Sequence, residues 1–364
     1  MNEIQQVGIL GSGIMGSGLA EVAARAGYNV IVRSCSLDSA KAMVSSIDKG
    51  FVKAIERGKA SEEDRTAVLA RITATDHLGA LANCDLVIES VVEDLAIKKA
   101  LFAQLEQIVK PSCILATNTS TLPVVEMAMV TQRPSQVVGI HFFNPAPMMK
   151  LVEVVRPITA SDETVAVALA FAASCGKDGV EVKDRAGFIV NALLFPYLNN
   201  AVRMWEQGTA SMESIDTAMK GGCNFPMGPF ALLDLVGLDT SLAILDALYA
   251  EFRDPNYAAM STLRRMVAAG HLGRKTKKGF YAYCGRGVGC VAAAVVRTCR
   301  ADHVCPPSRR SDFELSGRVV PLGPRVRIAP NRIGGWAHHR EELALCFHSG
   351  EWRNGRRAGF RCQY

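Results

Sequence analysis

The sequence predicts an α/β protein in which a doubly wound parallel sheet is followed by an all-α carboxyl-terminal domain. In residues 1–187, short apolar runs of strand length alternate with longer helical patterns, which is typical of a doubly wound sheet. In residues 188–283, the apolar patterns are long and helical, and Gly/Pro clusters separate them. A length of 364 residues fits two such domains.

The first element carries a glycine-rich segment. The apolar run over residues 7–10 predicts a strand, Gly11-Ser12-Gly13-Ile14-Met15-Gly16 comes next, and a helical pattern then continues to Gly27. The spacing G-x-G-x-x-G between a strand and a helix is typical of dinucleotide binding, because the glycines allow a tight turn, close approach of a pyrophosphate and packing of helix on strand. The helix N-terminus then faces the anion. We therefore expect a Rossmann-type domain that binds NAD or NADP through residues 11–16.

The end of the second predicted strand, residues 29–32, bears on the choice between the two dinucleotides. NAD-binding domains usually place Asp or Glu there for the ribose hydroxyls, whereas this chain has Arg33 and Ser34. An Arg can accommodate a 2′-phosphate and a Ser can hydrogen-bond to it. Asp38 is the nearest carboxylate, and we expect it early in the following helix. The hypothesis is that NADP is accepted, and the preference between NAD and NADP stays open.

Further strands and helices alternate along the first domain. We expect a helical stretch over residues 37–69 with a break at 58–61, a strand over 85–89, a helix over 96–109, and strands over 113–116 and 137–141. The carboxyl ends of parallel strands share one edge of a sheet, where ligands bind. Glu93, Ser120 and His141 lie at or just past such ends, so we expect them beside the glycine-rich segment.

His141 and Glu153 form the candidate catalytic pair. His141 ends one apolar run, and Glu153 lies twelve residues later in a second run, residues 151–155, which can return beside the first. A His held by a carboxylate is typical of proton transfer. A lone His is more often a core residue bonded to a backbone carbonyl, and it is the preceding dinucleotide segment that favours the catalytic interpretation.

The second domain is predicted to be helical. A long apolar helix begins at Phe188 and runs towards Trp205. Further helices are expected over residues 212–219, 231–236, 240–251 and 260–269, with breaks at 221–222, 226–229 and 270, and a final strand over 279–283. The apolar character of these helices is consistent with a surface buried in a second subunit, and a monomer core explains it almost as well.

The net charge of +6 does not indicate nucleic-acid binding by the two domains. Residues 284–364 carry fourteen Arg, no Lys and six acidic residues, so residues 1–283 have a net charge of −2. No apolar stretch approaches the roughly 20 residues of a membrane span, and the amino terminus lacks a secretory pattern. We therefore expect a cytoplasmic protein that binds neither nucleic acid nor membrane.

Residues 284–364 form an atypical tail that is rich in Arg and Cys and has no helical or strand period. We expect this tail to be disordered or translated out of frame, so truncation after Tyr283 should leave activity intact. Nucleic-acid binding through the Arg excess is one alternative. A zinc site is another, but no C-x-x-C pair supports it, and we expect no metal. The ligands of such a zinc site would be Cys284, Cys290, Cys299, His303 and Cys305.

With these motifs in place, residues 4–283 resemble the 3-hydroxyacyl-CoA dehydrogenases, particularly the short bacterial 3-hydroxybutyryl-CoA dehydrogenases. The resemblance implies a Rossmann domain with a helical dimerisation domain, and reversible oxidation of (S)-3-hydroxyacyl-CoA to 3-oxoacyl-CoA by hydride transfer to NAD or NADP. The motifs that carry it are residues 11–16, 87–94, 118–121, 141–145, 150–153, 187–191, 226–229 and 279–281.

The resemblance also implies a role for single residues. His141 would be the general base and Glu153 would orient it. Ser120 and Asn191 would hydrogen-bond to substrate oxygens, although a turn hydroxyl and a helix-start residue are ordinary alternatives. Cofactor contacts are implied for Glu93, Lys98, Ser120, Asn144 and Lys275, and contact with CoA for Lys59.

Two departures from the family pattern stand out. Ser34 occupies the position of the usual acidic residue, and Thr121 that of a second Ser. Two alternatives stay open. The β-hydroxyacid dehydrogenases share a similar glycine-rich start but use a catalytic lysine, and lens crystallins related to this family are structural proteins. The presence of His141 and Glu153 argues against the first alternative. A structural protein would tend to lose its polar site groups, and this chain keeps Ser120, His141, Glu153 and Asn191.

Overall fold

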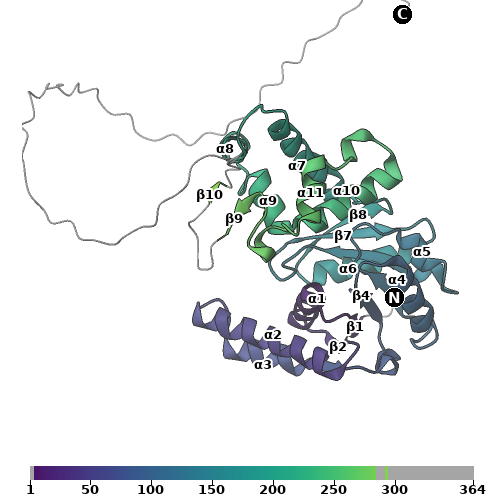
Figure 1. The fold of residues 1–364 in the computed structure, drawn as a ribbon. Coiled ribbons are helices and arrows are strands. Elements are labelled where there is room, and N and C mark those ends of the chain that lie inside the picture. Colours follow the sequence, from purple (N-terminus) through teal and green to yellow (C-terminus); the bar gives the residue numbers. More distant parts are fainter. Residues whose placement is uncertain (1–3, 284–291, 294–364) are drawn as a thin grey trace, which may run out of the picture. The chain divides into compact units, whose positions relative to one another are not determined.

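The computed structural model describes residues 4–283 and 292–293. Its first part is an eight-stranded sheet with the strand order β3-β2-β1-β4-β5-β6-β7-β8 (Figure 1). The strands are β1 Gln6–Leu10, β2 Asn29–Arg33, β3 Ile72–Thr75, β4 Leu86–Glu89, β5 Ile114–Thr117, β6 Val137–Phe142, β7 Leu151–Arg156 and β8 Asp178–Lys183.

Helices cover both faces of this sheet, as in a doubly wound fold. One face has a core that includes Leu19 of α1 and Phe171 of α6, and the other face has a core that includes Phe102 of α4 and Met127 of α5. The helices of this part are α1 Ile14–Arg25, α2 Leu37–Glu56, α3 Glu62–Ala70, η1 Leu78–Leu81, α4 Leu95–Glu106, α5 Val124–Ala128, η2 Pro134–Gln136 and α6 Asp162–Ser174.

The predicted fold class is confirmed, with one difference in strand direction. All pairs from β3 to β6 are parallel, but β7 runs antiparallel to β6, and β8 is parallel to β7. The antiparallel pair places residues at the ends of β6 and β7 directly opposite each other. The sheet is therefore mixed. Strand β7 begins at the edge of the sheet where β6 and the other parallel strands end.

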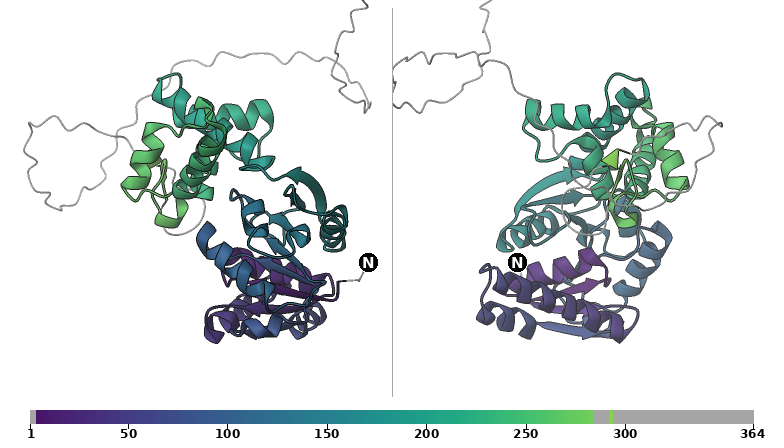
Figure 2. Two further views of the ribbon diagram at one scale, coloured as in Figure 1. Left: turned by 90° about the vertical axis from the view of Figure 1, so that its right-hand side faces the viewer. Right: turned by 60° about the vertical axis from the view of Figure 1, so that its left-hand side comes forward.

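The predicted break in the first long helical stretch is confirmed. Helix α2 ends at Glu56, and α3 begins at Glu62 after a capping box between Ser61 and Asp64. The views in Figures 1 and 2 agree that α2 and α3 run side by side.

The second part of the chain is helical, and its core includes Phe195, Leu198, Phe230, Leu245 and Phe280. Its elements are α7 Val190–Glu206, α8 Met212–Cys223, α9 Pro229–Val236, α10 Leu238–Phe252, η3 Pro255–Tyr257, α11 Ser261–Ala268, η4 Arg274–Thr276 and the short strands β9 Tyr281–Ala282 and β10 Ala292–Ala293.

One predicted break was wrong. Helix α8 continues through Gly221 and Gly222 to Cys223, and it ends where Asn224 adopts a left-handed conformation. Asn tolerates that conformation better than most residues, so it can end a helix in place of Gly.

In the described part of the chain, no helix has the length and apolar character needed to cross a membrane. Apart from Ala292 and Ala293, which form β10, the residues of the tail lie outside the described part, and so do all the ligands of the zinc alternative.

Candidate active site

The predicted dinucleotide segment, residues 11–16, comprises the turn after β1 and the first three residues of α1, and we call it the glycine-rich turn. Gly11 has φ +107°, and a Cβ there would lie 2.2 Å from the carbonyl oxygen of Ser90. A Cβ on Gly16 would lie 2.0 Å from the carbonyl oxygen of Gly11. Gly13 differs, because a Cβ there would meet no atom within 4 Å. Two glycines are therefore required by the chain's own backbone, and the third leaves open space, which fits the close approach of a pyrophosphate.

The end of β2 carries no acidic side chain. Ser34 is buried, and its hydroxyl donates to the hydroxyl of Ser12 in the glycine-rich turn at 2.8 Å. Arg33 donates from Nε to the carbonyl oxygen of Asp76 at 3.1 Å. Asp38 lies in the first turn of α2, as expected. The neutral Ser34 thus lies next to the predicted dinucleotide site.

Lys98 is buried in an ion-pair network, although a lysine of this kind without the family resemblance would be interpreted as a solvated surface charge. Only 1% of its side chain is exposed. Its Nζ lies 2.6 Å from Oε1 of Glu89 and 3.2 Å from Oε2 of Glu93. Glu89 also accepts hydrogen bonds from the backbone N–H of Val91 and the hydroxyl of Thr117. A buried charge is tolerated when it is paired and hydrogen-bonded in this way.

Glu93 connects this network to the loop that carries Ser120. Its Oε1 accepts the backbone N–H of Ser120 at 3.0 Å and also the hydroxyl of Thr119. Glu93 follows β4 and Ser120 follows β5, so the carboxylate joins the loops at the ends of two neighbouring strands. The structure therefore brings together three of the predicted residues, Glu93, Lys98 and Ser120.

His141 and Glu153 face each other across β6 and β7. They are direct cross-strand partners, and Nδ1 of His141 lies 2.8 Å from Oε2 of Glu153. Both side chains are buried. The other carboxylate oxygen accepts the backbone N–H groups of Ile189 and Val190 at 3.0 Å each. Because these are free donors at the N-terminus of α7, the carboxylate also interacts favourably with the helix dipole.

This geometry determines which ring nitrogen of His141 is available. A carboxylate accepts hydrogen bonds, so Nδ1 carries the proton that it donates to Glu153. Nε2 of the neutral ring is then an acceptor. The aromatic rings of Phe143 and Phe188 lie beside the imidazole, with centroids 4.5 and 5.4 Å away. The pair can therefore take up a proton through Nε2.

The other predicted residues come from several elements. Asn191 is buried and follows Val190 directly, so the contact between Glu153 and α7 brings it near the start of β7, where β6 ends. Asn144 is exposed, three residues after His141. Lys59 is exposed in the turn between α2 and α3, and Lys275 pairs with Asp239 of α10. Among the described residues, no hydrogen bond links either lysine to His141.

Comparisons with known proteins agree with this geometry. Residues 6–185 match the model of the 3-hydroxyacyl-CoA dehydrogenase NAD binding domain, and residues 187–283 match that of the 3-hydroxyacyl-CoA dehydrogenase C-terminal domain. The chain belongs to the 3-hydroxyacyl-CoA dehydrogenase family. It is therefore an oxidoreductase with the family's NAD-binding domain.

Individual relatives are similar over nearly their whole length. A Mycobacterium tuberculosis protein named 3-hydroxybutyryl-CoA dehydrogenase is 46% identical, and the match covers 77% of this chain and 99% of that protein. A Bacillus subtilis protein named probable 3-hydroxybutyryl-CoA dehydrogenase is 43% identical, with 77% and 98% covered. The crystal structure of (S)-3-hydroxybutyryl-CoA dehydrogenase from Ralstonia eutropha is 41% identical, with a TM-score of 0.75, and the match covers 78% of this chain and all of that one.

Three further polar residues of this dehydrogenase lie at the carboxyl edge of the sheet, and they were not predicted from the sequence to be site residues. Glu89 and Asn118 end apolar strand runs, and a polar residue in that place is the signal that could have found them. Lys177 lies far along the chain, between α6 and β8, and donates to the carbonyl oxygens of Ala146 and Met149 at 2.7 and 2.9 Å. Burial lowers the pKa of its ammonium group.

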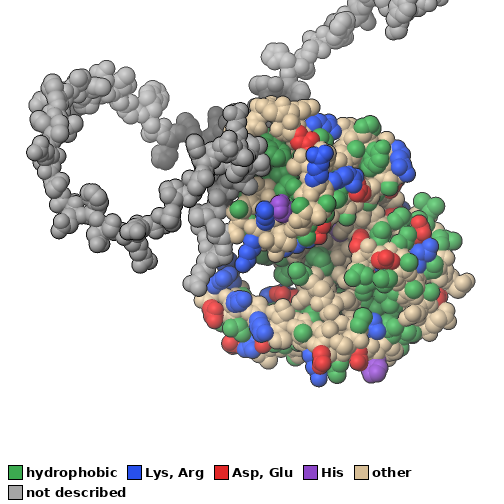
Figure 3. All heavy atoms as spheres, viewed as in Figure 1, with side chains coloured by type: hydrophobic (Ala, Val, Ile, Leu, Met, Phe, Trp, Pro, Cys, Tyr) green, Lys and Arg blue, Asp and Glu red, His purple; other side chains and the backbone are tan. Residues whose placement is uncertain are grey.

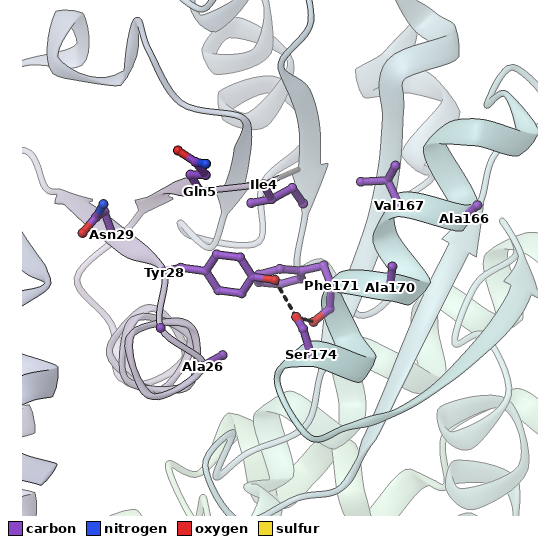
Figure 4. Close-up of a pocket in the computed structure, with 11 residues that line it drawn as sticks. Ile4, Gln5, Ala26, Tyr28, Asn29, Ala166, Val167, Ala170, Phe171 and Ser174 are labelled. Atoms are coloured by element: carbon purple, nitrogen blue, oxygen red, sulfur yellow. Dashed lines mark hydrogen bonds between the residues drawn. The ribbon is translucent and has the colours of Figure 1, made fainter. Parts of the chain in front are cut away.

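One cavity lined by described residues lies away from the predicted site residues. A cavity of about 840 Å³ lies where β1 and β2 begin, opposite to the glycine-rich turn. Figure 4 shows Tyr28 and Phe171 in its wall, and the Tyr28 hydroxyl lies 2.5 Å from that of Ser174. Among the described residues, no charged side chain lines it, and none of the predicted site residues does. Because His141, Glu153 and Glu93 lie at the carboxyl edge of the sheet, that edge is the candidate active site.

Proposed function

We propose that this dehydrogenase reversibly oxidises (S)-3-hydroxyacyl-CoA, with the short-chain 3-hydroxybutyryl-CoA as substrate, to 3-oxoacyl-CoA. The observation that carries the proposal is the buried His141–Glu153 pair, which lies at the same sheet edge as the glycine-rich turn. The names of the bacterial relatives support the short-chain substrate. The activity would be cytoplasmic, as expected from the sequence.

The proton leaves the substrate through His141. Nε2 removes the proton of the 3-hydroxyl, and Nδ1–H stays bonded to Glu153, whose negative charge stabilises the ring when it becomes positive. The bound nicotinamide dinucleotide supplies the acceptor for the hydride of C3. In the reverse direction, the protonated ring returns its proton to the oxygen of the 3-oxo group.

Ser120 and Asn191 would hydrogen-bond to the substrate oxygens, where negative charge is largest during the reaction. A glutamate holds the backbone beside each of these two residues. Glu93 accepts the backbone N–H of Ser120, and Glu153 accepts that of Val190 in the first turn of α7, which contains Asn191. Donors that are already in place pay no reorganisation cost when charge develops.

The dinucleotide would be held by the turn over residues 11–16, with Glu93, Lys98, Ser120, Asn144 and Lys275 as further contacts. The open space at Gly13 fits its pyrophosphate. Lys98 would act mainly through Glu93, because its Nζ already lies between two carboxylates.

NADP would be accepted as well as NAD. Arg33 and the neutral Ser34 support this, since neither repels a 2′-phosphate. The matched test is Ser34→Asp, which restores the acidic side chain that is usual at this position. We expect the variant to lose kcat/KM with NADPH by at least tenfold and to keep it with NADH. A wild-type enzyme that strongly prefers NADH would contradict the proposal.

The CoA part of the substrate would contact Lys59. This residue lies on the pair α2–α3, where Figure 3 shows several basic side chains on the face in view. Basic side chains attract the phosphates of CoA. Lys59→Ala should raise KM for acyl-CoA several-fold and leave kcat unchanged.

A homodimer would form through the helical region, residues 188–283, with dinucleotide binding in residues 1–187. Two apolar side chains of α7 support this, because Leu193 is 72% exposed and Met204 is 44% exposed. Exposed apolar surface of this kind is typical of an interface. Analytical ultracentrifugation of chains ending at residues 283 and 364 tests the dimer, and it also tests whether the tail is dispensable. A monomer in both would contradict the proposal.

A spectrophotometric assay tests the reaction itself. Reduction of 3-oxoacyl-CoAs of C4 to C16 is followed by the loss of NADH or NADPH absorbance. We expect turnover that is highest with acetoacetyl-CoA. If neither dinucleotide is oxidised with any of these substrates, the proposed function is wrong.

A further inference from the structure

The hydrogen-bond ladder between β5 and β6 ends before it reaches the active site. Backbone pairing of these parallel strands stops at Thr117 opposite Gly139. Beyond this point, β6 stays paired on its other side, with β7, as far as Phe142. The two strands that carry the Ser120 loop and His141 therefore have no backbone pairing next to these residues.

The side chain of Asn118 provides the missing connection. Its Oδ1 accepts the backbone N–H of Phe142 at 2.8 Å. Its own backbone N–H donates to the carbonyl oxygen of Glu89 at 2.8 Å, so the residue stays attached to β4. Asn118 and Phe142 are both buried. The bond is therefore shielded from water, and without it a buried backbone N–H would lose its partner.

The position of this bond relates it to the proposed reaction. Asn118 precedes Ser120 by two residues, and Phe142 directly follows His141. The other end of the Ser120 loop is held by Glu93. One hydrogen bond thus connects the segment that would bind the substrate oxygen to the segment that would take its proton.

We propose that Asn118 is a positioning residue that fixes Ser120 relative to His141. The proposal rests on the proposed function, since it concerns the alignment of those two groups. Without the acceptor oxygen, the end of β6 and the Ser120 loop can move apart. A displacement of about 1 Å at reacting groups can lower the rate about 100-fold.

The test uses two substitutions and a matched control. Asn118→Leu removes the acceptor at similar side-chain size, and Asn118→Asp keeps an acceptor oxygen in the same place. Asn199 of α7 is the control, because it is also buried and accepts a backbone N–H, that of Met260, at 3.0 Å. Asn199 lies in the helical core and bonds to none of the site residues. Asn199→Leu should therefore cost stability without changing catalytic geometry.

We expect Asn118→Leu to lower kcat with acetoacetyl-CoA about 10- to 100-fold while KM for the dinucleotide changes by less than about threefold. Asn118→Asp should recover most of the lost kcat, and Asn199→Leu should keep wild-type kcat at a lower melting temperature. A folded Asn118→Leu enzyme with wild-type kcat would overturn the proposal, and so would an Asn118→Asp enzyme as slow as Asn118→Leu. Absence of turnover in the wild type would instead refute the proposed function.

Discussion

Two buried carboxylates, Glu153 in the sheet and Asp234 in the helical region, anchor the chain in the same way. Glu153 accepts the backbone N–H groups of Ile189 and Val190, and Asp234 accepts those of Phe280 and Tyr281 at 2.9 and 2.8 Å. Their third partners differ. Glu153 bonds to the imidazole of His141, whereas Asp234 accepts the hydroxyl of Tyr283.

Because only the third partner differs, hydrogen bonds from a carboxylate to backbone N–H groups do not by themselves account for the proposed proton transfer. A His can exchange a proton near neutral pH, which a Tyr cannot do. Burial, together with the charge of Asp234, raises the pKa of Tyr283 to about 12, and burial also raises the pKa of Asp234. We therefore propose that the same arrangement of hydrogen bonds serves catalysis at Glu153 and stability at Asp234.

The largest effect is expected from His141→Gln. This change removes the proposed base but keeps a polar side chain of similar size, so kcat with acetoacetyl-CoA should fall about 10²–10⁴-fold. Dinucleotide binding, measured by fluorescence titration, should not change. A folded variant that binds the dinucleotide and turns over at nearly the wild-type rate would show that His141 is not the base, and Glu153 would then not differ from Asp234 in function.

Glu153→Gln should have the next largest effect. Its carbonyl oxygen can still accept the N–H groups of Ile189 and Val190, but the variant lacks the negative charge that is proposed to stabilise protonated His141. We expect kcat to fall about 10- to 100-fold, with a loss of stability of roughly 1–3 kcal/mol. Steady-state kinetics together with urea unfolding separate the two losses. A variant with normal kcat and lower stability would make Glu153 an anchor only, like Asp234.

Asp234→Asn should show the reverse pattern. One of the hydrogen bonds to this buried group is weakened or lost, which costs roughly 1–3 kcal/mol and lowers Tm by several degrees. The kcat of the folded enzyme should not change, because no predicted site residue bonds to Asp234 among the described residues. Calorimetry and kinetics on the same sample test this expectation, and a large loss of kcat would show that the two anchors are not distinct.

The smallest effect concerns Tyr283 at alkaline pH. A raised pKa means that the folded state holds the phenol proton more tightly than the unfolded state. The resulting stabilisation is complete below the ordinary pKa of 10.0 and is lost as pH rises through about 12. The urea midpoint of the wild type should therefore fall more between pH 9.5 and 11.5 than that of Tyr283→Phe. Equal slopes would show that Tyr283 does not carry the effect.

The parts of the site that local sequence determines were predictable. The glycine-rich turn depends on backbone geometry within a few residues, and His141 and Glu153 appear as polar residues within apolar runs. The direction of β7 was not predictable, because an apolar run has the same pattern in a parallel and an antiparallel strand. It is this direction that makes the two residues direct partners.

Other features depend on contacts between distant segments. The buried charge of Lys98 is tolerated because Glu89 and Glu93 pair with it, and the residue types alone give no sign of that pairing. Strand β8 was not predicted, because it is an edge strand whose mostly exposed residues include Asp178 and Lys183. Its pairing with β7 comes from the sheet and not from its own apolar period.

The pH dependence of alcohol oxidation tests the central claim most directly, namely that the His141–Glu153 pair takes the substrate proton. The kcat/KM for 3-hydroxybutyryl-CoA is measured from pH 5 to 9 in the wild type and in His141→Gln. On the acidic side, the wild-type value should fall about tenfold per pH unit, because protonation of the ring removes the base. The His141→Gln value should be low and independent of pH over that range. The same acidic limb in the variant would show that another group is the base.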